Sequence, residues 1–521
     1  MVLETLLMSS SVLLVILAVC VVLYYKWCFT YWKRKNVFTL PPSIPFGNAK
    51  ENFYRQVSFA HSIIRLYRII KSKGLQYGGY YMLWKPIFIP VDPNLIKLIL
   101  NKDFDHFTNT VNYSNEKTDP LSGNLFFLKG DKWRLIRSKL SSTFTSGKNK
   151  SMLNTMVKCT EHMPNILDRA NEQGEAIEVK EFYARFTTDL IGACALGVNC
   201  SALLDENSPY RDHGRRIFDI RPNQTIKSLL YMAMPNVLKF FNVSINRKDV
   251  ESFFLNTAKE IVEYRKKNNI VNKDFISLLM SMMNKEISVE IKTGRSKNPD
   301  GERIFYSQNG LTQNEIGCQA FVFFQAGFEM ASTCLTFLTY ELCLNQDVQD
   351  KLRNEIVDVL DKYNGEITYE AINEMTYLDQ CVYEALRKHP PFIPIHRECT
   401  KTYKVPDTDL VIEKGTPVFI SAWAIQHDPE HYPDPERFNP ERFSKENKAK
   451  RNPYTFLSFG EGPRFCIGMR FGLLEVKVGI ASILPKYKFS ISPKMQVPIE
   501  YDPNEFTLTA KGGIWLNVDK I

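Results

Sequence analysis

The sequence predicts a mainly α-helical protein with small β-sheets, preceded by one N-terminal membrane-spanning segment. Three observations support this fold class. An uncharged apolar run lies at the N-terminus, helical periodicity dominates after residue 50, and short strand-like segments lie at 80–90, at 404–420 and near the C-terminus. No long Ser/Gly linker divides the 521 residues, so we expect one large domain over 51–521.

The first 25 residues predict a transmembrane anchor, 1–25. Thr5–Tyr25 carries no charge, and about 20 apolar residues span a bilayer core as a helix. Basic residues follow at 26 and 33–35, which places the rest of the chain on the cytosolic side. A cleaved signal peptide is the alternative, but no basic residue precedes the run and no A-x-A site follows it. We therefore expect a retained single-pass anchor.

Residues 26–50 predict a basic and proline-rich hinge. Prolines at 41, 42 and 45 lock φ and stiffen the connector. Trp27, Tyr31 and Trp32 are expected at the membrane interface, where aromatic side chains are enriched. Such a hinge would fix the orientation of the following domain over the membrane.

The composition excludes several functional classes. The formal net charge of +9 comes from 66 basic and 57 acidic residues, a modest excess that suits an anionic membrane surface or an acidic partner. The sequence has no nucleic-acid recognition module, so no nucleic-acid partner is expected. The 11 cysteines are scattered without C-x-x-C spacing, which argues against a zinc site or a disulfide framework and favours a reducing compartment.

A long buried helix is predicted from Leu311 to about Cys343, after a polar segment, 285–308, that predicts a surface loop. Thr312 and Glu315 form a capping-box pattern, and an apolar helix with few charges belongs in a core. Gly327 and Glu329 both lower the stability of a buried helix. Together they indicate a local opening for a small molecule and water. A helix-packing glycine beside a surface glutamate is the alternative.

The segment Phe459–Gly468, FGEGPRFCIG, predicts a metal-bound thiolate. A thiolate ligand needs a lowered pKa, N–H groups aimed at sulfur and shielding from oxidation. Glycines at 460 and 462 permit a tight loop, and Cys466 would begin a helix that runs to Leu484. Arg464 would pair with a cofactor carboxylate. Phe459 would cover the sulfur, and Gly468 would admit a flat ligand. A buried cysteine beside a turn is the alternative.

This segment resembles the haem-binding loop F-x-x-G-x-R-x-C-x-G of the cytochrome P450 family, and the resemblance covers nearly the whole chain. It implies a cytochrome P450 fold, with haem b between the long central helix and the cysteine loop. It also implies that Cys466 is the axial thiolate ligand of the haem iron. Segments that look like those of insect microsomal, xenobiotic-metabolising members are Asn115–Ser122, Phe144–Lys148 and Phe186–Gly192.

The resemblance assigns further side chains to the cofactor. It implies that four residues surround the haem propionates: Trp133, Arg137, Arg397 and Arg464. On its own, the W-x-x-x-R spacing of the first two also fits an amphipathic surface helix.

A structural charge network is implied by an E-x-x-R pattern and a later P-E-R-F segment. Its members would be Glu384, Arg387 and Arg442. An exposed, weakly stabilising pair is the alternative for E-x-x-R alone. Loss of one member of a buried network would leave an uncompensated charge and unfold the haem pocket.

The segment Ala326–Thr333 resembles the family's oxygen-binding motif A-G-x-[DE]-T-[ST], with Gly327 and Glu329 in matching positions. It departs at Met330, where the family has a threonine whose hydroxyl helps deliver protons, and methionine is a poor proton relay. Thr333 lies about 4.5 Å further along the helix axis, too far to substitute directly. A water chain held by Glu329 remains open.

The resemblance implies a haem-thiolate monooxygenase of the endoplasmic reticulum membrane with a cytosolic catalytic domain. It would insert one oxygen atom from O2 into an apolar xenobiotic, lipid or hormone-like molecule. Electrons would come from NADPH through a separate NADPH–cytochrome P450 reductase, with cytochrome b5 as a further partner, because the sequence has no dinucleotide fingerprint. The alternatives are an isomerase or dehydratase acting without reductase, which Met330 favours, and a non-catalytic haem-binding protein.

Overall fold

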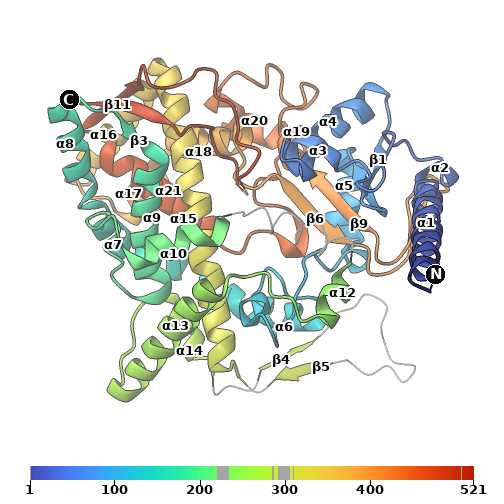
Figure 1. Cartoon of the computed structure of the whole chain (residues 1–521). Coiled ribbons are helices and arrows are strands. Elements are labelled where there is room, and N and C mark those ends of the chain that lie inside the picture. The colour runs from blue at the N-terminus through green and yellow to red at the C-terminus, as the bar shows by residue number, and fades with distance from the viewer. Residues whose placement is uncertain (1, 220–233, 284–286, 291–304, 309, 506) are drawn as a thin grey trace. The chain divides into compact units, whose positions relative to one another are not determined.

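The computed structural model describes residues 2–219, 234–283, 287–290, 305–308, 310–505 and 507–521. The chain divides into two compact units. The first comprises Met1–Asn112, Arg221–Phe240 and Pro394–Ser421, and the second comprises Tyr113–Ile220, Phe241–Ile393 and Ala422–Ile521. Helices dominate and the sheets are small (Figure 1), which confirms the predicted fold class.

The first unit contains a four-stranded sheet in the order β1-β2-β9-β6. The pairs β1–β2 and β6–β9 are antiparallel, whereas β2–β9 is parallel. Strand segments at 80–90 and 404–420 are therefore confirmed. The elements of this unit are α1 (Val2–Cys28), α2 (Tyr31–Arg34), α3 (Lys50–Phe53), α4 (Phe59–Ser72), β1 (Tyr77–Met82), β2 (Lys85–Pro90), α5 (Pro93–Lys97), η1 (Leu98–Lys102), η2 (Phe104–His106), α12 (Pro235–Phe240), β6 (Pro394–Glu398), β7 (Tyr403–Lys404), β8 (Val411–Ile412) and β9 (Pro417–Ser421).

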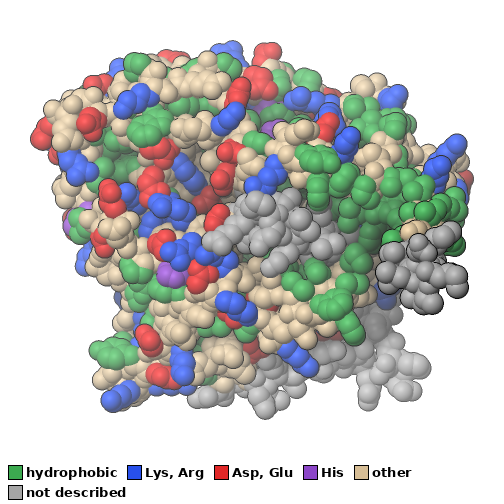
Figure 2. Space-filling view, in the orientation of Figure 1, with side chains coloured by type: hydrophobic (Ala, Val, Ile, Leu, Met, Phe, Trp, Pro, Cys, Tyr) green, Lys and Arg blue, Asp and Glu red, His purple; other side chains and the backbone are tan. Residues whose placement is uncertain are grey.

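Helix α1 has the properties of a membrane anchor. Its apolar side chains between Val12 and Leu23 are exposed, and green side chains gather over this helix in Figure 2. Two described segments are long and apolar enough to cross a bilayer, Ser10–Arg34 and α15 (Gln313–Leu344), but their windows are 11% and 72% buried respectively. Only the first therefore presents an apolar surface that a bilayer would cover.

The segment after α1 packs onto the sheet of its own unit, and this corrects one expectation. Trp32 is fully buried, and its Nε1 donates to the Tyr80 carbonyl at 3.2 Å. A Cβ at Gly79 would lie only 2.5 Å from the Trp32 ring, so glycine at that position makes room for the indole. The expectation that Trp32 lies at a membrane interface is wrong, whereas Trp27 is 60% exposed.

The second unit is built around α15 (Gln313–Leu344), the long yellow helix in Figure 1. Helices α9 (Val179–Ile191), α13 (Lys248–Asn268), α18 (Thr376–Lys388) and α21 (Met469–Ile483) pack against it. The predicted capping box is confirmed: Thr312 Oγ1 accepts from the Glu315 N–H at 3.2 Å, and Glu315 Oε2 accepts from the Thr312 N–H at 3.0 Å.

The remaining elements of the second unit surround this helix. The antiparallel sheet has the order β10-β11-β3, which confirms strands near the C-terminus. The elements are η3 (Pro120–Gly123), α6 (Gly130–Ser141), η4 (Ser142–Phe144), α7 (Ser146–Thr160), α8 (Met163–Gln173), β3 (Ile177–Glu178), α9 (Val179–Ile191), η5 (Gly192–Leu196), α10 (Pro209–Phe218), α13 (Lys248–Asn268), α14 (Phe275–Met280), β4 (Ile287–Glu290), β5 (Phe305–Gln308), α16 (Gln346–Lys362), α17 (Tyr369–Glu374), α18 (Thr376–Lys388), α19 (Ala422–Gln426), η6 (Pro440–Phe443), α20 (Lys445–Lys450), η7 (Pro453–Thr455), η8 (Gly462–Arg464), α21 (Met469–Ile483), β10 (Tyr487–Ile491) and β11 (Trp515–Lys520).

The predicted loop at 285–308 is wrong where β4 and β5 pair in antiparallel register. Ile287–Glu290 alternates apolar with polar residues, and Phe305–Gln308 begins with two aromatic residues, and both features favour strands. The rest of this predicted loop, 285–286 and 291–304, lies outside the described residues.

Candidate functional site

The cysteine loop is a closed turn that ends at α21. The Cys466 N–H donates to the Phe459 carbonyl at 2.8 Å, and this bond closes the loop. Gly460 and Gly462 have φ of +68° and +72°, a region that glycine adopts without strain. The helix predicted from Cys466 begins instead at Met469. Cys466 therefore lies just before the N-terminus of α21.

The Cys466 thiol is free and accessible to solvent. Protein atoms nevertheless surround it, and this desolvation raises its pKa, whereas the Gly468 N–H and the Arg137 charge lower it. A group that is accessible and yet surrounded faces a hollow in the protein rather than its outer surface. The sulfur is therefore available to a ligand inside the second unit.

Gly468 provides a test of whether a cofactor fits this hollow. Its backbone φ of −87° suits any residue, and an added Cβ would meet only a Phe144 ring carbon at 3.8 Å, an ordinary contact. The polypeptide itself therefore does not require glycine here. A free thiol, an inward N–H group and an unfilled space at Gly468 fit a flat cofactor whose metal binds sulfur.

Helix α6 brings two of the predicted side chains to this loop. Trp133 is buried, and the Arg464 guanidinium lies 3.9 Å from the centre of its ring. Arg464 also donates from Nη2 to the Leu128 carbonyl at 2.9 Å. Arg137 lies over the Phe465 ring at 4.9 Å. Two cations thus lie at the cysteine loop, and the Arg137 charge acts on the thiol, an arrangement that suits an anionic cofactor.

Arg397 belongs to the first unit. It is buried, its Nη1 donates to the His396 carbonyl at 2.8 Å, and its Nε has no partner among the described residues. Burial lowers the pKa of Arg397 to about 10. No carboxylate in the described part of the chain forms an ion pair with it. A buried cation in this state suits an anionic group such as a propionate, but its predicted place beside Trp133, Arg137 and Arg464 stays a prediction.

The three members of the proposed charge network lie together. Glu384 and Arg387 on α18 are fully buried and form an ion pair at 2.8 Å. Arg442 Nε, from η6, lies 3.4 Å from Glu384 Oε1. The Asn439 N–H donates to the same carboxylate oxygen at 2.9 Å. This network joins the P-E-R-F segment to α18. The segment precedes the cysteine loop in the sequence.

Helix α15 runs through Gly327 and Met330 without a break. A Cβ at Gly327 would lie 2.5 Å from Ile191 of α9, so close helix packing requires this glycine. Met330 is half-buried, and Ala326 is exposed although α15 is a core helix. The face of α15 that carries Ala326 therefore borders a hollow, and no charge lies at Ala326, Gly327 or Met330.

Glu329 is buried and has partners that the sequence did not indicate. Its Oε1 accepts from Lys180 Nζ at 2.9 Å and from Thr507 Oγ1 at 2.7 Å. Neither residue was predicted as a partner of Glu329. The only sequence signal is that a carboxylate in an apolar helix requires a partner, which does not say where that partner lies.

The chain is similar to known proteins over almost its whole length. A family model described as Cytochrome P450 matches residues 60–517. "Probable cytochrome P450 6a14" of Drosophila melanogaster is 37% identical over 498 residues, which are 95% of this chain and 96% of the relative. "Cytochrome P450 6a9" of the same organism is 38% identical over 515 residues, 98% of this chain and 99% of the relative.

Proposed function

The chain belongs to the cytochrome P450 family of haem monooxygenases, and we infer that it receives electrons from NADPH through a separate reductase. From this premise we propose that Cys466 is the axial ligand of haem b and that the substrate is an apolar small molecule. The accessible Cys466 thiol, beside the unfilled space at Gly468, carries this proposal. When bound, the haem iron supplies the activation of O2.

The polypeptide would hold and orient the cofactor and shield it from solvent. Desolvation raises the pKa of the Cys466 thiol, and the Gly468 N–H and the Arg137 charge partly oppose this rise. Arg137 and Arg464 offer positive charge to cofactor carboxylates. The uncharged side chains of Ala326 and Met330 on α15 suit an apolar xenobiotic, lipid or hormone-like substrate.

The proposed setting is the endoplasmic reticulum membrane, crossed once by α1. The exposed apolar surface of α1 and the basic residues that follow it support a cytosolic catalytic unit. The proposed electron donor is NADPH–cytochrome P450 reductase, with cytochrome b5 as a second donor. The net charge of +9 supports docking of acidic partners.

Full-length protein reconstituted with reductase and NADPH tests this proposal. A panel of alkoxycoumarins, whose dealkylation releases a fluorescent product, serves as the apolar probe. We expect a thiolate-type carbon monoxide spectrum and product that depends on both NADPH and reductase. Cys466→Ser should abolish the spectrum, whereas Cys159→Ser should keep it. Product formed without NADPH would overturn the monooxygenase assignment.

A further inference from the structure

The two partners of Glu329 come from segments far from α15 in the sequence. Lys180 lies in the first turn of α9, and Thr507 lies in the C-terminal segment before β11. Both bonds reach the same oxygen, Oε1, and the Glu329 side chain is only 10% exposed. Two donors from separate segments fix the carboxylate in one orientation, because moving it breaks a charge-assisted bond.

Thr507 is the only hydroxyl that bonds to this carboxylate in the described part of the chain. The two nearest hydroxyls of α15, those of Ser332 and Thr333, accept instead from Lys180 Nζ at 3.0 and 2.7 Å. With Glu329 they occupy all three donors of the ammonium. Met330 contributes no hydroxyl, so the C-terminal segment supplies one that α15 lacks.

The second carboxylate oxygen of Glu329 remains accessible to water. Oε2 receives no hydrogen bond from the described residues, and it is not sealed from solvent. A carboxylate held at one oxygen and hydrated at the other can exchange a proton without losing its position.

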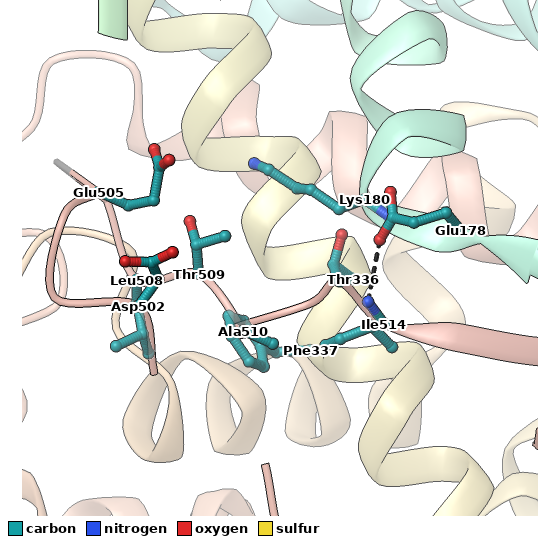
Figure 3. Close-up of a pocket in the computed structure, with 11 residues that line it drawn as sticks. Glu178, Lys180, Thr336, Phe337, Asp502, Glu505, Leu508, Thr509, Ala510 and Ile514 are labelled. Carbon is teal, nitrogen blue, oxygen red and sulfur yellow. Dashed lines mark hydrogen bonds between the residues drawn. The ribbon is translucent and has the colours of Figure 1, made fainter. Parts of the chain in front are cut away.

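Lys180 also lines a cavity of about 240 Å³, which we call the Glu505 pocket. Its polar lining comprises Glu178, Lys180, Thr336, Asp502, Glu505 and Thr509. In Figure 3 the Lys180 side chain extends along this pocket, with its amino end directed towards Glu505. Glu505 is exposed, and desolvation followed by the Asp502 and Glu329 charges raises its pKa.

We propose that Lys180 and Thr507 are positioning residues that hold Glu329 for proton transfer, and that the Glu505 pocket supplies the water that reprotonates it. The proposal rests on the function proposed above. Reduction of the second oxygen atom to water consumes protons. In each cycle Oε2 of the ionised Glu329 takes a proton from a pocket water and then releases it for this reduction, so the carboxylate returns to its ionised state. The hydroxide left in the pocket takes up a proton from bulk solvent.

A substitution at Thr507 tests the positioning. Thr507→Val removes the hydroxyl at nearly constant volume, and Thr507→Ser keeps it. Thr160→Val is the matched control, because the Thr160 hydroxyl is similarly buried but bonds to the Val157 carbonyl. The first measurement is infrared: the carboxylate stretching band of Glu329, identified by its loss in Glu329→Gln, should move in Thr507→Val and stay in Thr160→Val.

The second measurement is the partition of consumed NADPH between 7-ethoxycoumarin product and hydrogen peroxide. Thr507→Val should lower the product share about three- to tenfold, a part of the 10²–10⁴ that positioned proton transfer contributes. Thr507→Ser should restore it. Met330→Thr, which returns a hydroxyl to α15, should partly rescue Thr507→Val.

The outcomes separate the two proposals. An unchanged partition in Thr507→Val overturns the positioning role even if the infrared band moves, because the bond would then be structural only. If wild-type protein forms product without NADPH, the proposed function fails instead, and the infrared comparison on resting protein alone decides whether Thr507 holds Glu329.

The pocket has its own test. Glu505→Gln removes a titratable group from the pocket and leaves both Glu329 contacts in place. We expect the product share to fall in this variant while the Glu329 band stays, and Glu500→Gln, an exposed neighbour paired with Lys511, is the control. An unchanged product share in Glu505→Gln overturns the role of the pocket.

Discussion

The Glu384 carboxylate and the Arg387 guanidinium form a bidentate ion pair, and both side chains are fully excluded from solvent. The Nε–Oε2 and Nη2–Oε1 distances are 2.9 and 2.8 Å. The third nitrogen, Nη1, donates to the Gln426 carbonyl at 3.2 Å. Such a pair is insensitive to salt, because no solvent lies between its charges.

Glu384→Gln should therefore destabilise the protein by about 3–5 kcal/mol, because it leaves the buried Arg387 charge uncompensated. Unfolding in guanidinium chloride, followed by circular dichroism, measures this loss. Asp212→Asn is the control: it breaks the exposed pair with Arg216 and should cost about 0.2–1 kcal/mol. Equal losses in both variants would contradict the prediction.

Gly327→Ala should destabilise the contact between α15 and α9 by about 1–3 kcal/mol, because the new methyl overlaps Ile191. Ile191→Ala in the same protein should recover part of this loss, so the two substitutions should be non-additive. Gly472→Ala in α21 is the control. Nothing lies within 4 Å of its added Cβ, and the change should raise stability by up to about 1 kcal/mol. Additive effects of the first two substitutions would exclude the packing explanation.

Gly468→Val should lower the haem content without a matching loss of fold. The protein has space for a Cβ at this position, so the substitution should weaken binding of the haem that Gly468 is proposed to admit, and not folding. Haem per polypeptide, measured as the pyridine haemochrome, should fall several-fold, while far-ultraviolet circular dichroism stays unchanged. Gly472→Val should retain haem, and equal haem loss in both variants would argue against a special role for Gly468.

Glu475 on α21 should make stability fall as the pH rises. Its side chain is fully buried, neither oxygen has a hydrogen-bond partner in the described structure, and desolvation raises its pKa well above the usual range. A pKa raised in the folded state gives stability that is complete below the unfolded value, about 4.3, and is lost as the pH rises towards the folded value.

Glu475→Gln removes this dependence, so the variant should gain on the wild type by up to about 1.4 kcal/mol per pH unit over that window. Denaturation midpoints at pH 5, 6 and 7 measure the difference. Glu446→Gln, at an exposed position on α20, should show a constant difference from the wild type. A constant difference for Glu475→Gln as well would mean that the carboxyl is solvated or paired.

The sequence alone determined the features whose requirements lie within one short segment. The Thr312–Glu315 capping box and the positive φ of Gly460 and Gly462 followed from residue type and spacing, because their partners are a few residues away. The anchor helix followed from an uninterrupted apolar run for the same reason.

Only the tertiary structure decided which distant side chains meet. Glu329 is bound by residues 149 and 178 positions away, and periodicity in α15 contains no information about either. The burial of Trp32 depends on the space above Gly79, and Gly327 is required by Ile191 of another helix. The free energy of these contacts comes from packing and charge pairing between segments, so the sequence showed that Glu329 needed a partner but not that Lys180 and Thr507 would provide it.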